Sequence, residues 1–388
     1  MRTYLHPRLQ SFGTTIFAEM SQLATATGSI NLGQGFPDTD GPDVVKQAAL
    51  DAIAEGRGNQ YPPGPGIPEL RRAIANHQRA YYGISLDVDT QVLVTCGATE
   101  AIAAALLALL GPGDECILLE PFYDSYPAAV AMAGATVVPV TLPGPDFQID
   151  ADALRAAITA RTKVIVVNSP HNPTGTVFNA ASQAAICALA IEHDLVVLSD
   201  EAYEHLTFDG VTHVPMSTLP GMAERTITVG SAGKSLSFTG WKVGWATGSP
   251  ALVSAVRTAK QFLTYVASGP FQYAVAVGLD TLGPSYFAEL AGALAGKRDR
   301  LSEGLRSCGL TVLKPHGTYF VTADISALTD MDGLTFCRAL PERCRVVAIP
   351  TSVFYSDPSH GRSYVRFAFC KRDDVIDEAV ARLATLRA

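Results

Sequence analysis

The chain has 388 residues, enough for roughly two to three domains of average size. Apolar residues make up 48% of it and charged residues only 17%, so a large buried core can form. The net charge of −8 and the lack of a Lys/Arg-rich tract argue against a nucleic-acid-binding surface.

The seven cysteines are scattered, and none falls in a C-x-x-C pair, which argues against a zinc site or a disulfide framework. We therefore expect reduced thiols in a cytoplasmic protein. The first residues, MRTYLHPRLQSFG, contain no apolar run of the kind found in signal peptides. The longest apolar run, Ala101 to Leu110, is too short to cross a bilayer and predicts a core helix, so no membrane partner is expected.

Residues 1–40 are predicted to form an N-terminal arm that belongs to a smaller domain. A helical segment, Thr15 to Ala24, leads into the loop NLGQGFPD, whose glycines, Gly35 among them, let the backbone approach a ligand. Helices are predicted at Asp43 to Ala54 and at Glu69 to Tyr82, on either side of a Pro/Gly cluster.

Residues 41–284 are predicted to form a large domain in which short apolar strands alternate with helices, for example Ala153 to Ala160 and Ala180 to His193. Strands that are apolar throughout indicate a mostly parallel sheet of seven strands with helices on both faces, an α/β fold. The strands are Val92 to Thr95, Cys116 to Leu119, Thr136 to Val140, Val164 to Val167, Val196 to Ser199, Thr226 to Val229 and Val243 to Thr247.

Helices at Ala251 to Val266 and Gln272 to Leu282 precede a Gly-Pro pair that marks a domain boundary. Residues 285–388 are then predicted to form the smaller α+β domain. Its expected elements are the helices Phe287 to Ser307 and Asp373 to Leu386 and the strands Leu310 to Leu313, Thr318 to Ala323, Val346 to Ile349 and Ser363 to Phe369.

Three polar loops follow apolar strands of the large domain: NSPHNPTG, SDEAY and GSAGKS, which contains Lys234. A lysine at the end of a strand is by itself usually a solvated surface residue. Open α/β sheets, however, bind ligands at the carboxyl ends of their strands, where these loops meet. Together they can form a pocket for pyridoxal phosphate, with Lys234 as its Schiff base.

Gly97, Ala98 and Thr99 open a helix, whose free N–H groups and dipole favour an anion such as a phosphate. An ordinary helix start is an equally good interpretation of these three residues alone. Ser231 and Lys242 lie on either side of Lys234 and can add a hydroxyl and a positive charge to the same phosphate site.

Asp200 stands just past an apolar strand, where a carboxylate is costly to bury without a cationic partner. A pyridinium N–H supplies such a partner, although a helix N-cap is the alternative role for an aspartate here. Tyr203 and Asn172 can hydrogen-bond the ring hydroxyl, and Tyr123 can stack on the ring.

Lys234 must be partly neutral to act as a nucleophile, and burial together with the nearby Lys242 would lower its pKa. Its free amine can then move a proton from the substrate Cα to the cofactor. Arg366 lies on a mostly apolar strand, where its fork suits a substrate carboxylate. An internal Asp or Glu is an equally suitable partner for it.

Two other known motifs share part of their pattern with the loop that contains Lys234. GSAGKS differs from a P-loop because Thr228 stands where that motif requires glycine. The S-x-x-K spacing from Ser231 to Lys234 matches penicillin-recognising acyl enzymes, but their S-D-N and K-T-G partners are absent. An acyl-serine hydrolase using Ser231 and a non-catalytic regulator remain as alternatives from other classes, although a regulator would need a DNA-binding extension.

The motifs NPTG, D-x-x-Y and S-x-x-K-x7-K, in this order, resemble those of the class I, fold type I pyridoxal-phosphate aminotransferases. The resemblance runs from NLGQGFPD to SYVRFAF and is strongest to two branches. These are the kynurenine–glutamine aminotransferases and the actinobacterial N-succinyldiaminopimelate aminotransferases. Phe17 stands where kynurenine-type enzymes carry a tryptophan, and stretches such as NQYPPGPG and EPFYDSY are more similar to the second branch.

The resemblance implies a ping-pong aminotransferase with glutamate as the expected donor and succinylated amino-oxopimelate as the expected acceptor. A broad aromatic or sulfur amino-acid aminotransferase with β-lyase side activity is the alternative. Tyr61 is expected to reach the site of a neighbouring subunit, which implies a homodimer. The remaining implied roles are the Schiff base (Lys234), the ring contacts (Asp200, Asn172, Tyr203, Tyr123), the phosphate site (Gly97, Ala98, Thr99, Ser231, Lys242) and the substrate site (Gly35, Asn172, Arg366, Phe17).

Overall fold

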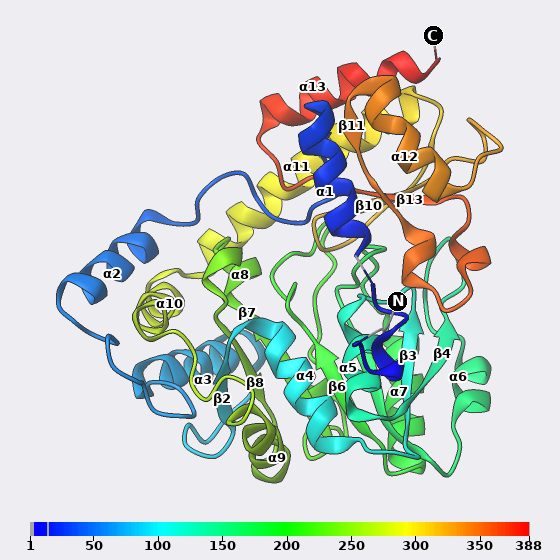
Figure 1. Ribbon diagram of the computed structural model, residues 1–388. Helices are drawn as coiled ribbons and strands as arrows, with labels where there is room; N and C mark the ends of the chain where they lie inside the picture. Colours follow the sequence, from blue (N-terminus) through cyan, green and yellow to red (C-terminus); the bar gives the residue numbers. More distant parts are fainter. Residues whose placement is uncertain (1–3, 14, 388) are drawn as a thin grey trace.

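A computed structural model describes residues 4–13 and 15–387 (Figure 1). Its largest sheet has seven strands, all parallel except β8, which runs antiparallel to both of its neighbours. The predicted mostly parallel sheet is therefore confirmed. In spatial order the strands are β2 (Val92–Thr95), β8 (Gly244–Thr247), β7 (Thr226–Ser231), β6 (Val196–Asp200), β5 (Thr162–Asn168), β3 (Glu115–Glu120) and β4 (Thr136–Thr141).

Helices cover both faces of this sheet because its central strands are buried on both sides. Leu198 and Ile227 pack on one face with the helices α4, α5 and α9, whereas Val197 and Ile165 pack on the other. The helices of the large domain are α2 (Asp43–Ala54), α3 (Pro68–Tyr82), α4 (Gly97–Leu109), α5 (Ser125–Ala133), α6 (Ala151–Ala157), α7 (Ala180–Glu192), α8 (Ala232–Ser235), α9 (Pro250–Lys260) and α10 (Gly269–Thr281).

A separate, smaller domain lies above the carboxyl edge of the large sheet in Figure 1. Its sheet has the order β12-β13-β10-β9 and is antiparallel throughout. The elements are α11 (Pro284–Ser307), β9 (Thr311–Leu313), β10 (Phe320–Asp324), α12 (Gly333–Cys344), β11 (Val346–Val347), β12 (Ile349–Pro350), β13 (Tyr364–Ala368) and α13 (Asp373–Leu383).

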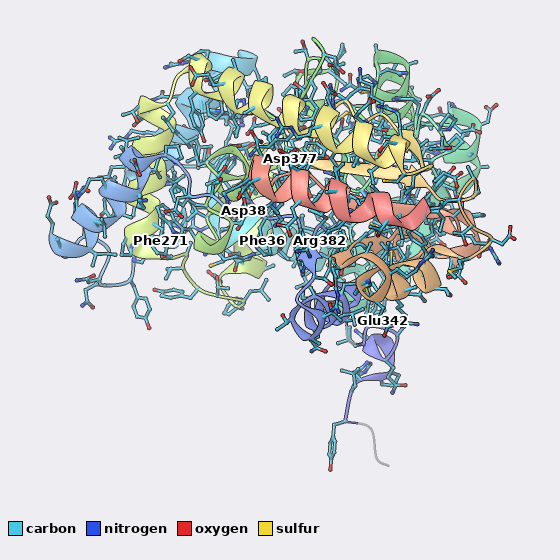
Figure 2. All side chains as sticks on the ribbon, turned by 90° about the horizontal axis from the view of Figure 1, so that it is seen from above. Phe36, Asp38, Phe271, Glu342, Asp377 and Arg382 are labelled. Carbon is cyan, nitrogen blue, oxygen red and sulfur yellow. The ribbon has the colours of Figure 1, made fainter. Side chains whose placement is uncertain are left out.

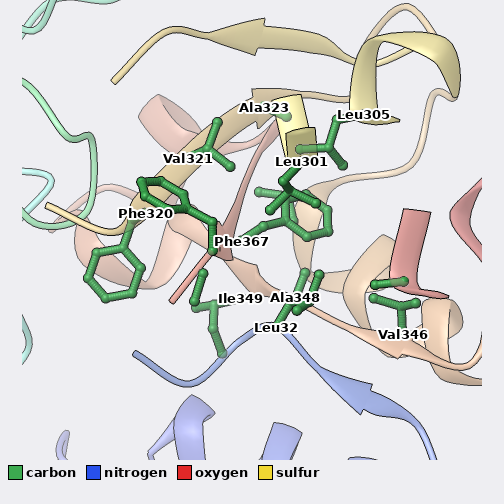
Figure 3. Close-up of a cluster of buried hydrophobic side chains, with 14 of the residues drawn as sticks. Leu32, Leu301, Leu305, Phe320, Val321, Ala323, Val346, Ala348, Ile349 and Phe367 are labelled. Carbon is green, nitrogen blue, oxygen red and sulfur yellow. The ribbon is translucent and has the colours of Figure 1, made fainter. Parts of the chain in front are cut away.

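The arm at the start of the chain packs into this smaller domain. Its helix α1 (Ile16–Thr27) lies against α12, and its short strand β1 (Ile30–Asn31) pairs in parallel with β11. Figure 3 shows Leu32 of the arm among the buried side chains of the small domain, near Ile349 and Ala348. The following loop is also held there, because Lys371 Nζ donates to the carbonyl oxygen of Phe36 at 2.7 Å. Phe36 and Asp38 of this loop are labelled in Figure 2.

The described residues also form short 3₁₀ helices: η1 (Pro7–Leu9), η2 (Met216–Thr218), η3 (Thr239–Trp241), η4 (Thr351–Phe354), η5 (Pro358–Gly361) and η6 (Ala384–Arg387). All seven cysteines are free thiols, as expected. No helix within the described ranges is long and apolar enough to cross a membrane. The division of the chain at residues 40 and 284 stays a prediction.

Several predicted elements were wrong in extent. The helix expected from Ala251 to Val266 ends at Lys260, and the chain then turns. The strand expected at Val346 to Ile349 is two short strands in different sheets, because β11 pairs with β1 while β12 pairs with β13. The helices α5 and α12 were not identified from the sequence.

Candidate active site

A cavity of about 440 Å³ lies between the carboxyl edge of the large sheet and the smaller domain. All the residues predicted for the site line it, with the exception of Tyr61. They are Phe17, Gly35, Gly97, Ala98, Thr99, Tyr123, Asn172, Asp200, Tyr203, Ser231, Lys234, Lys242 and Arg366.

One end of the cavity is built to hold an anion. Helix α4 begins at Gly97, and no side chain caps the helix from the preceding Cys96. Instead, Glu100 accepts a hydrogen bond from the Cys96 N–H at 2.6 Å, one residue before the helix. The first N–H groups of α4 therefore point toward the cavity without a cap, and the helix dipole adds positive potential there.

Lys242 brings a full positive charge to the same end. A methyl group added at Gly97 would lie only 3.2 Å from the Lys242 Nζ, so that the ammonium sits directly over the helix start. Lys242 has a left-handed backbone (φ 55°) and follows the short helix η3, which turns its side chain back to α4. Ser231, at the end of β7, adds a hydroxyl to the cavity wall.

Asp200 stands at the end of β6 with only 6% of its surface exposed. Burial raises the pKa of its carboxyl, while a hydrogen bond from the Tyr126 hydroxyl at 2.6 Å opposes that shift. The other carboxyl oxygen accepts from the Ala202 N–H at 3.2 Å. Asp200 thus stabilises the turn after its strand and also faces the cavity, where a cationic partner would complete its interactions.

Lys234 lies on α8, directly after β7, and is half-buried in the cavity wall. Burial lowers the pKa of its amine to about 8, and the positive charges of Lys242 and Arg366 act in the same direction. Its Nζ lies 5.7 Å from the Tyr203 ring centroid. The interpretation as a solvated surface lysine is therefore wrong.

Arg366, on β13, forms the opposite end of the cavity and is 1% exposed. One guanidinium nitrogen donates to the Asn172 Oδ1 at 2.8 Å and another to the Gly33 carbonyl at 2.9 Å. Its Nε has no hydrogen-bond partner among the described residues, and its other two nitrogens bind an amide oxygen and a backbone carbonyl instead of a carboxylate. The alternative of an internal acidic partner is therefore wrong.

Aromatic rings surround this guanidinium. Its central carbon lies 3.9 Å from the Phe320 ring centroid and 5.2 Å from that of Phe17. The Gly35 carbonyl is fixed nearby by the Tyr319 hydroxyl at 2.5 Å. A methyl group at Gly35 would collide with Phe320, which explains why a glycine approaches the cavity here.

A chain of hydrogen bonds joins Asp200 to the Arg366 end of the cavity. Asn168 donates from its Nδ2 to the Asp200 carbonyl at 2.8 Å, and its Oδ1 accepts from the Asn172 N–H at 2.8 Å. Asn172 in turn accepts from Arg366. Asn168 and Tyr126 were missed in the sequence, although Asn168 is the last residue of β5 and could have been found by its place at the carboxyl edge.

Tyr61 is the predicted site residue that the fold does not bring to the cavity. It is 81% exposed and packs edge-on against Tyr265, with ring centroids 5.4 Å apart. Tyr123, by contrast, lines the cavity beside Thr99 as predicted.

Comparisons with known proteins agree with this geometry. Residues 27–383 match the family described as aminotransferase class I and II. The chain belongs to that family. It is 54% identical to the probable N-succinyldiaminopimelate aminotransferase DapC of Mycobacterium tuberculosis, over 98% of both chains.

Two further comparisons concern other members. The solved structure of the N-succinyldiaminopimelate aminotransferase from M. tuberculosis superposes with a TM-score of 0.96, covering 98% of this chain and 100% of that one. The methionine aminotransferase of Escherichia coli is 40% identical over 98% of this chain and 97% of its own. The fold is accordingly that of the fold type I aminotransferases.

Aminotransferases of this family use pyridoxal phosphate, and the cavity fits that cofactor. The uncapped start of α4 with Lys242 suits the phosphate dianion. The buried Asp200 suits a protonated ring nitrogen, and Lys234, with its lowered pKa, suits the aldehyde. The cavity therefore offers one matching group for each part of the cofactor: the phosphate, the ring nitrogen and the aldehyde.

Proposed function

We propose that this aminotransferase moves an amino group from glutamate to N-succinyl-2-amino-6-oxopimelate, a step of diaminopimelate and lysine biosynthesis. The observation that carries the proposal is the 54% identity, over 98% of both chains, to the probable enzyme of that name. Methionine and kynurenine aminotransferases are more distant, at 40% and 37% identity.

Each residue of the site has a role in the proposed reaction. Bound pyridoxal phosphate supplies the carbonyl that accepts the amino group and the electron sink that makes the substrate Cα acidic. Asp200 keeps a proton on the ring nitrogen, and Tyr126 orients its carboxylate. Lys234 moves the proton at the substrate Cα, because its amine can be neutral near physiological pH.

Arg366 would bind the carboxylate next to the reacting carbon. Its Nε is free, and Asn172 and Gly33 hold its other nitrogens, so the guanidinium is fixed before the substrate arrives. Arg366 is also the one arginine among the described residues that line this cavity. A second arginine for a short side-chain carboxylate, as aspartate would need, is not found there.

A second candidate activity is the transamination of methionine or aromatic amino acids, with β-lyase side activity. It is favoured by the aromatic rings around Arg366, where the ring centroids of Phe17 and Phe354 are 5.9 Å apart. Such a wall can bind an apolar side chain through its buried surface.

The deciding experiment measures kcat/KM for a panel of acceptors with glutamate as the donor. The panel contains N-succinyl-2-amino-6-oxopimelate, the 2-oxo acid of methionine, and the 2-oxo acids of phenylalanine and kynurenine. The proposal expects the succinylated compound to have the highest value by at least about tenfold. A higher value for a sulfur or aromatic acceptor would decide for the second candidate.

We also propose that the enzyme is a cytoplasmic homodimer. An exposed apolar cluster supports the dimer: Tyr61, Phe262, Leu263 and Tyr265, of which Phe262 is 82% exposed. The segment 262–265, which supplies three of these residues, is held next to the phosphate end of the cavity, because the Thr264 hydroxyl donates to Glu100 on α4. If a second copy of the chain packs on this cluster, the Tyr61 of each copy would lie beside the cavity of the other. The free thiols support a reducing compartment.

A further inference from the structure

A second cavity, of about 520 Å³, adjoins the first. The two share Thr15 and Asp124 in their walls, so that a ligand leaving the first cavity past these residues enters the second. The second cavity is lined by residues from the start of α1, the start of α5, helix α12 and the helix η4. Phe354 separates it from Arg366, whose guanidinium carbon is 5.3 Å from the Phe354 ring centroid.

The walls of the second cavity are mostly apolar, with one guanidinium. Among the described residues, the cationic side chains in the two cavities are Lys234, Lys242 and Arg366 in the first and Arg338 in the second. The first three are occupied by the roles described above. Arg338, on α12, is the cation left for a further anionic group. The apolar lining consists of Phe12, Ile16, Ala128, Leu334, Val353 and Phe354.

Arg338 is already paired, but the pair is exposed. Its Nε donates to the Glu19 Oε1 at 2.7 Å and its second nitrogen to the Glu19 Oε2 at 3.2 Å. The two side chains are 53% and 39% exposed. Exposed ion pairs of this kind contribute little to stability, so a carboxylate from a ligand can replace Glu19 at small cost.

Asp124, at the junction, is the other carboxyl group besides Glu19 among the described residues that line the second cavity. Burial raises the pKa of its carboxyl, although the charge of Arg366 acts against the shift. Beyond this junction, a cavity that combines apolar side chains with the guanidinium fork of Arg338 suits a chain of methylene groups with a carboxylate at its far end.

We propose that the second cavity is the distal subsite of the active site, where Arg338 binds a carboxylate remote from the reacting carbon after displacing Glu19. The substrates would be long amino acids and 2-oxo acids that carry a second acidic group. This deepens the proposed function, on which it rests for the type of reaction, because N-succinyl-2-amino-6-oxopimelate has two such distal carboxylates.

The test compares matched amino donors in the first half-reaction of the cofactor-loaded enzyme. L-2-Aminopimelate, L-2-aminosuberate and L-2-aminosebacate each carry a distal carboxylate, and the monocarboxylic amino acids of equal chain length do not. We expect the enzyme to prefer the dicarboxylic member of at least one pair by about tenfold, the value of one charge-assisted hydrogen bond.

Two variants then separate a ligand-binding role from a structural one. Arg338→Met should abolish the preference, and Glu19→Gln should raise it a few fold, because it removes the competing carboxylate. Both variants lose the same ion pair. If that pair had a purely structural role, the carboxylate preference would therefore change in the same direction in both variants. Arg343→Met, on the same helix but outside both cavities, is the matched control and should change nothing.

Equal rates for all matched pairs, or the same change in both variants, would overturn the subsite. The result is independent of the acceptor panel described above. If the succinylated acceptor is not used but the carboxylate preference follows Arg338 and Glu19, the proposed substrate fails and the subsite stands. If the succinylated acceptor is used but Arg338→Met does not change the carboxylate preference, the proposed substrate stands and the subsite fails.

Discussion

At the scale of single residues, the amine of Lys234 determines when the cofactor can be bound. Burial lowers its pKa to about 8 in the fold without cofactor, and only the neutral amine attacks an aldehyde. The neutral fraction rises as the pH rises through this pKa. We therefore expect the rate of pyridoxal phosphate uptake by the apoenzyme to increase with pH, to reach half its maximum near pH 8 and to level off about one pH unit higher.

Stopped-flow absorbance of the apoenzyme at a series of pH values measures this uptake. A rate that keeps rising in proportion to hydroxide up to about pH 10 would indicate an ordinary lysine pKa, near 10.4, and would contradict the assignment. Lys234→Arg is the control, since its guanidinium stays protonated and should show no covalent uptake at any of these pH values.

Tyr126 has a measurable role that the sequence did not reveal. Tyr126→Phe removes the hydrogen bond to Asp200, and hydrogen bonds to charged groups contribute about 1.5–3 kcal/mol. We expect kcat to fall at least about tenfold with KM nearly unchanged. Because that bond holds the Asp200 pKa down against burial, the acidic limb of the rate profile should also move to higher pH.

Tyr81→Phe is the matched control for this change. The Tyr81 hydroxyl is buried without a hydrogen-bond partner among the described residues, so its removal should leave both kcat and the pH profile unchanged. A fall in kcat for Tyr126→Phe without any shift of the acidic limb would indicate a packing effect and not an effect on Asp200.

The sequence located those site residues that follow an apolar strand directly. Asp200, Lys234 and Gly97 could be predicted because parallel strands end at one edge of a sheet. Tyr126 could not, because it belongs to the first turn of α5 and meets Asp200 only through the fold, 74 positions away in the chain.

At the scale of elements, the start of α4 depends on how closely β8 approaches it. A methyl group at Gly244 would lie 2.6 Å from the Ala98 backbone nitrogen, and neither backbone can move without shifting the helix. We expect Gly244→Ala to displace the N–H groups of the phosphate site and to cost about 2 kcal/mol. The Kd for pyridoxal phosphate should then rise at least about tenfold.

Fluorescence titration of the apoenzyme with the cofactor measures this Kd. Gly240→Ala is a suitable control because it lies on η3, beside Lys242, with open space around it and no left-handed backbone. If both variants bound the cofactor equally well, the close approach of β8 to α4 would not be what shapes the phosphate site.

The elements that were predicted wrongly share a physical cause. The chain after Lys260 was expected to stay helical, but the buried Lys260 ammonium binds the Tyr265 carbonyl at 2.9 Å and closes a turn there. Val346 to Pro350 divides into two strands because its partners, β1 and β13, come from opposite ends of the chain. Local patterns do not contain such distant pairings.

At the scale of the whole molecule, the two domains are joined by charge as well as by the chain. The buried Arg298 of α11 donates two hydrogen bonds, at 2.8 and 3.0 Å, to Asp209 in the loop region after β6. Thr207 pairs with Gly317 beside this contact. The loop that follows Asp200 and carries Tyr203 therefore continues directly into the contact with the smaller domain, which places the cavity at the junction.

Tyr61 is largely exposed in the single chain, which fits the proposed contact with the site of a second copy. Lys234→Ala and Tyr61→Ala each remove one half of a shared site and should both have low activity. In a mixed dimer, the Tyr61→Ala chain keeps Lys234 and receives an intact Tyr61 from its partner. One complete site per mixed dimer should form, so equal mixing with free exchange should restore about a quarter of the wild-type activity.

The measurement is the activity of the two variants after co-unfolding and refolding together, compared with each variant refolded alone. Complementation requires that the two residues of one site come from different chains, which a merely structural role for Tyr61 could not produce. Activity equal to the mean of the two separate samples would show that Tyr61 does not complete the site of a partner. The exposed cluster around Tyr265 would then need another explanation.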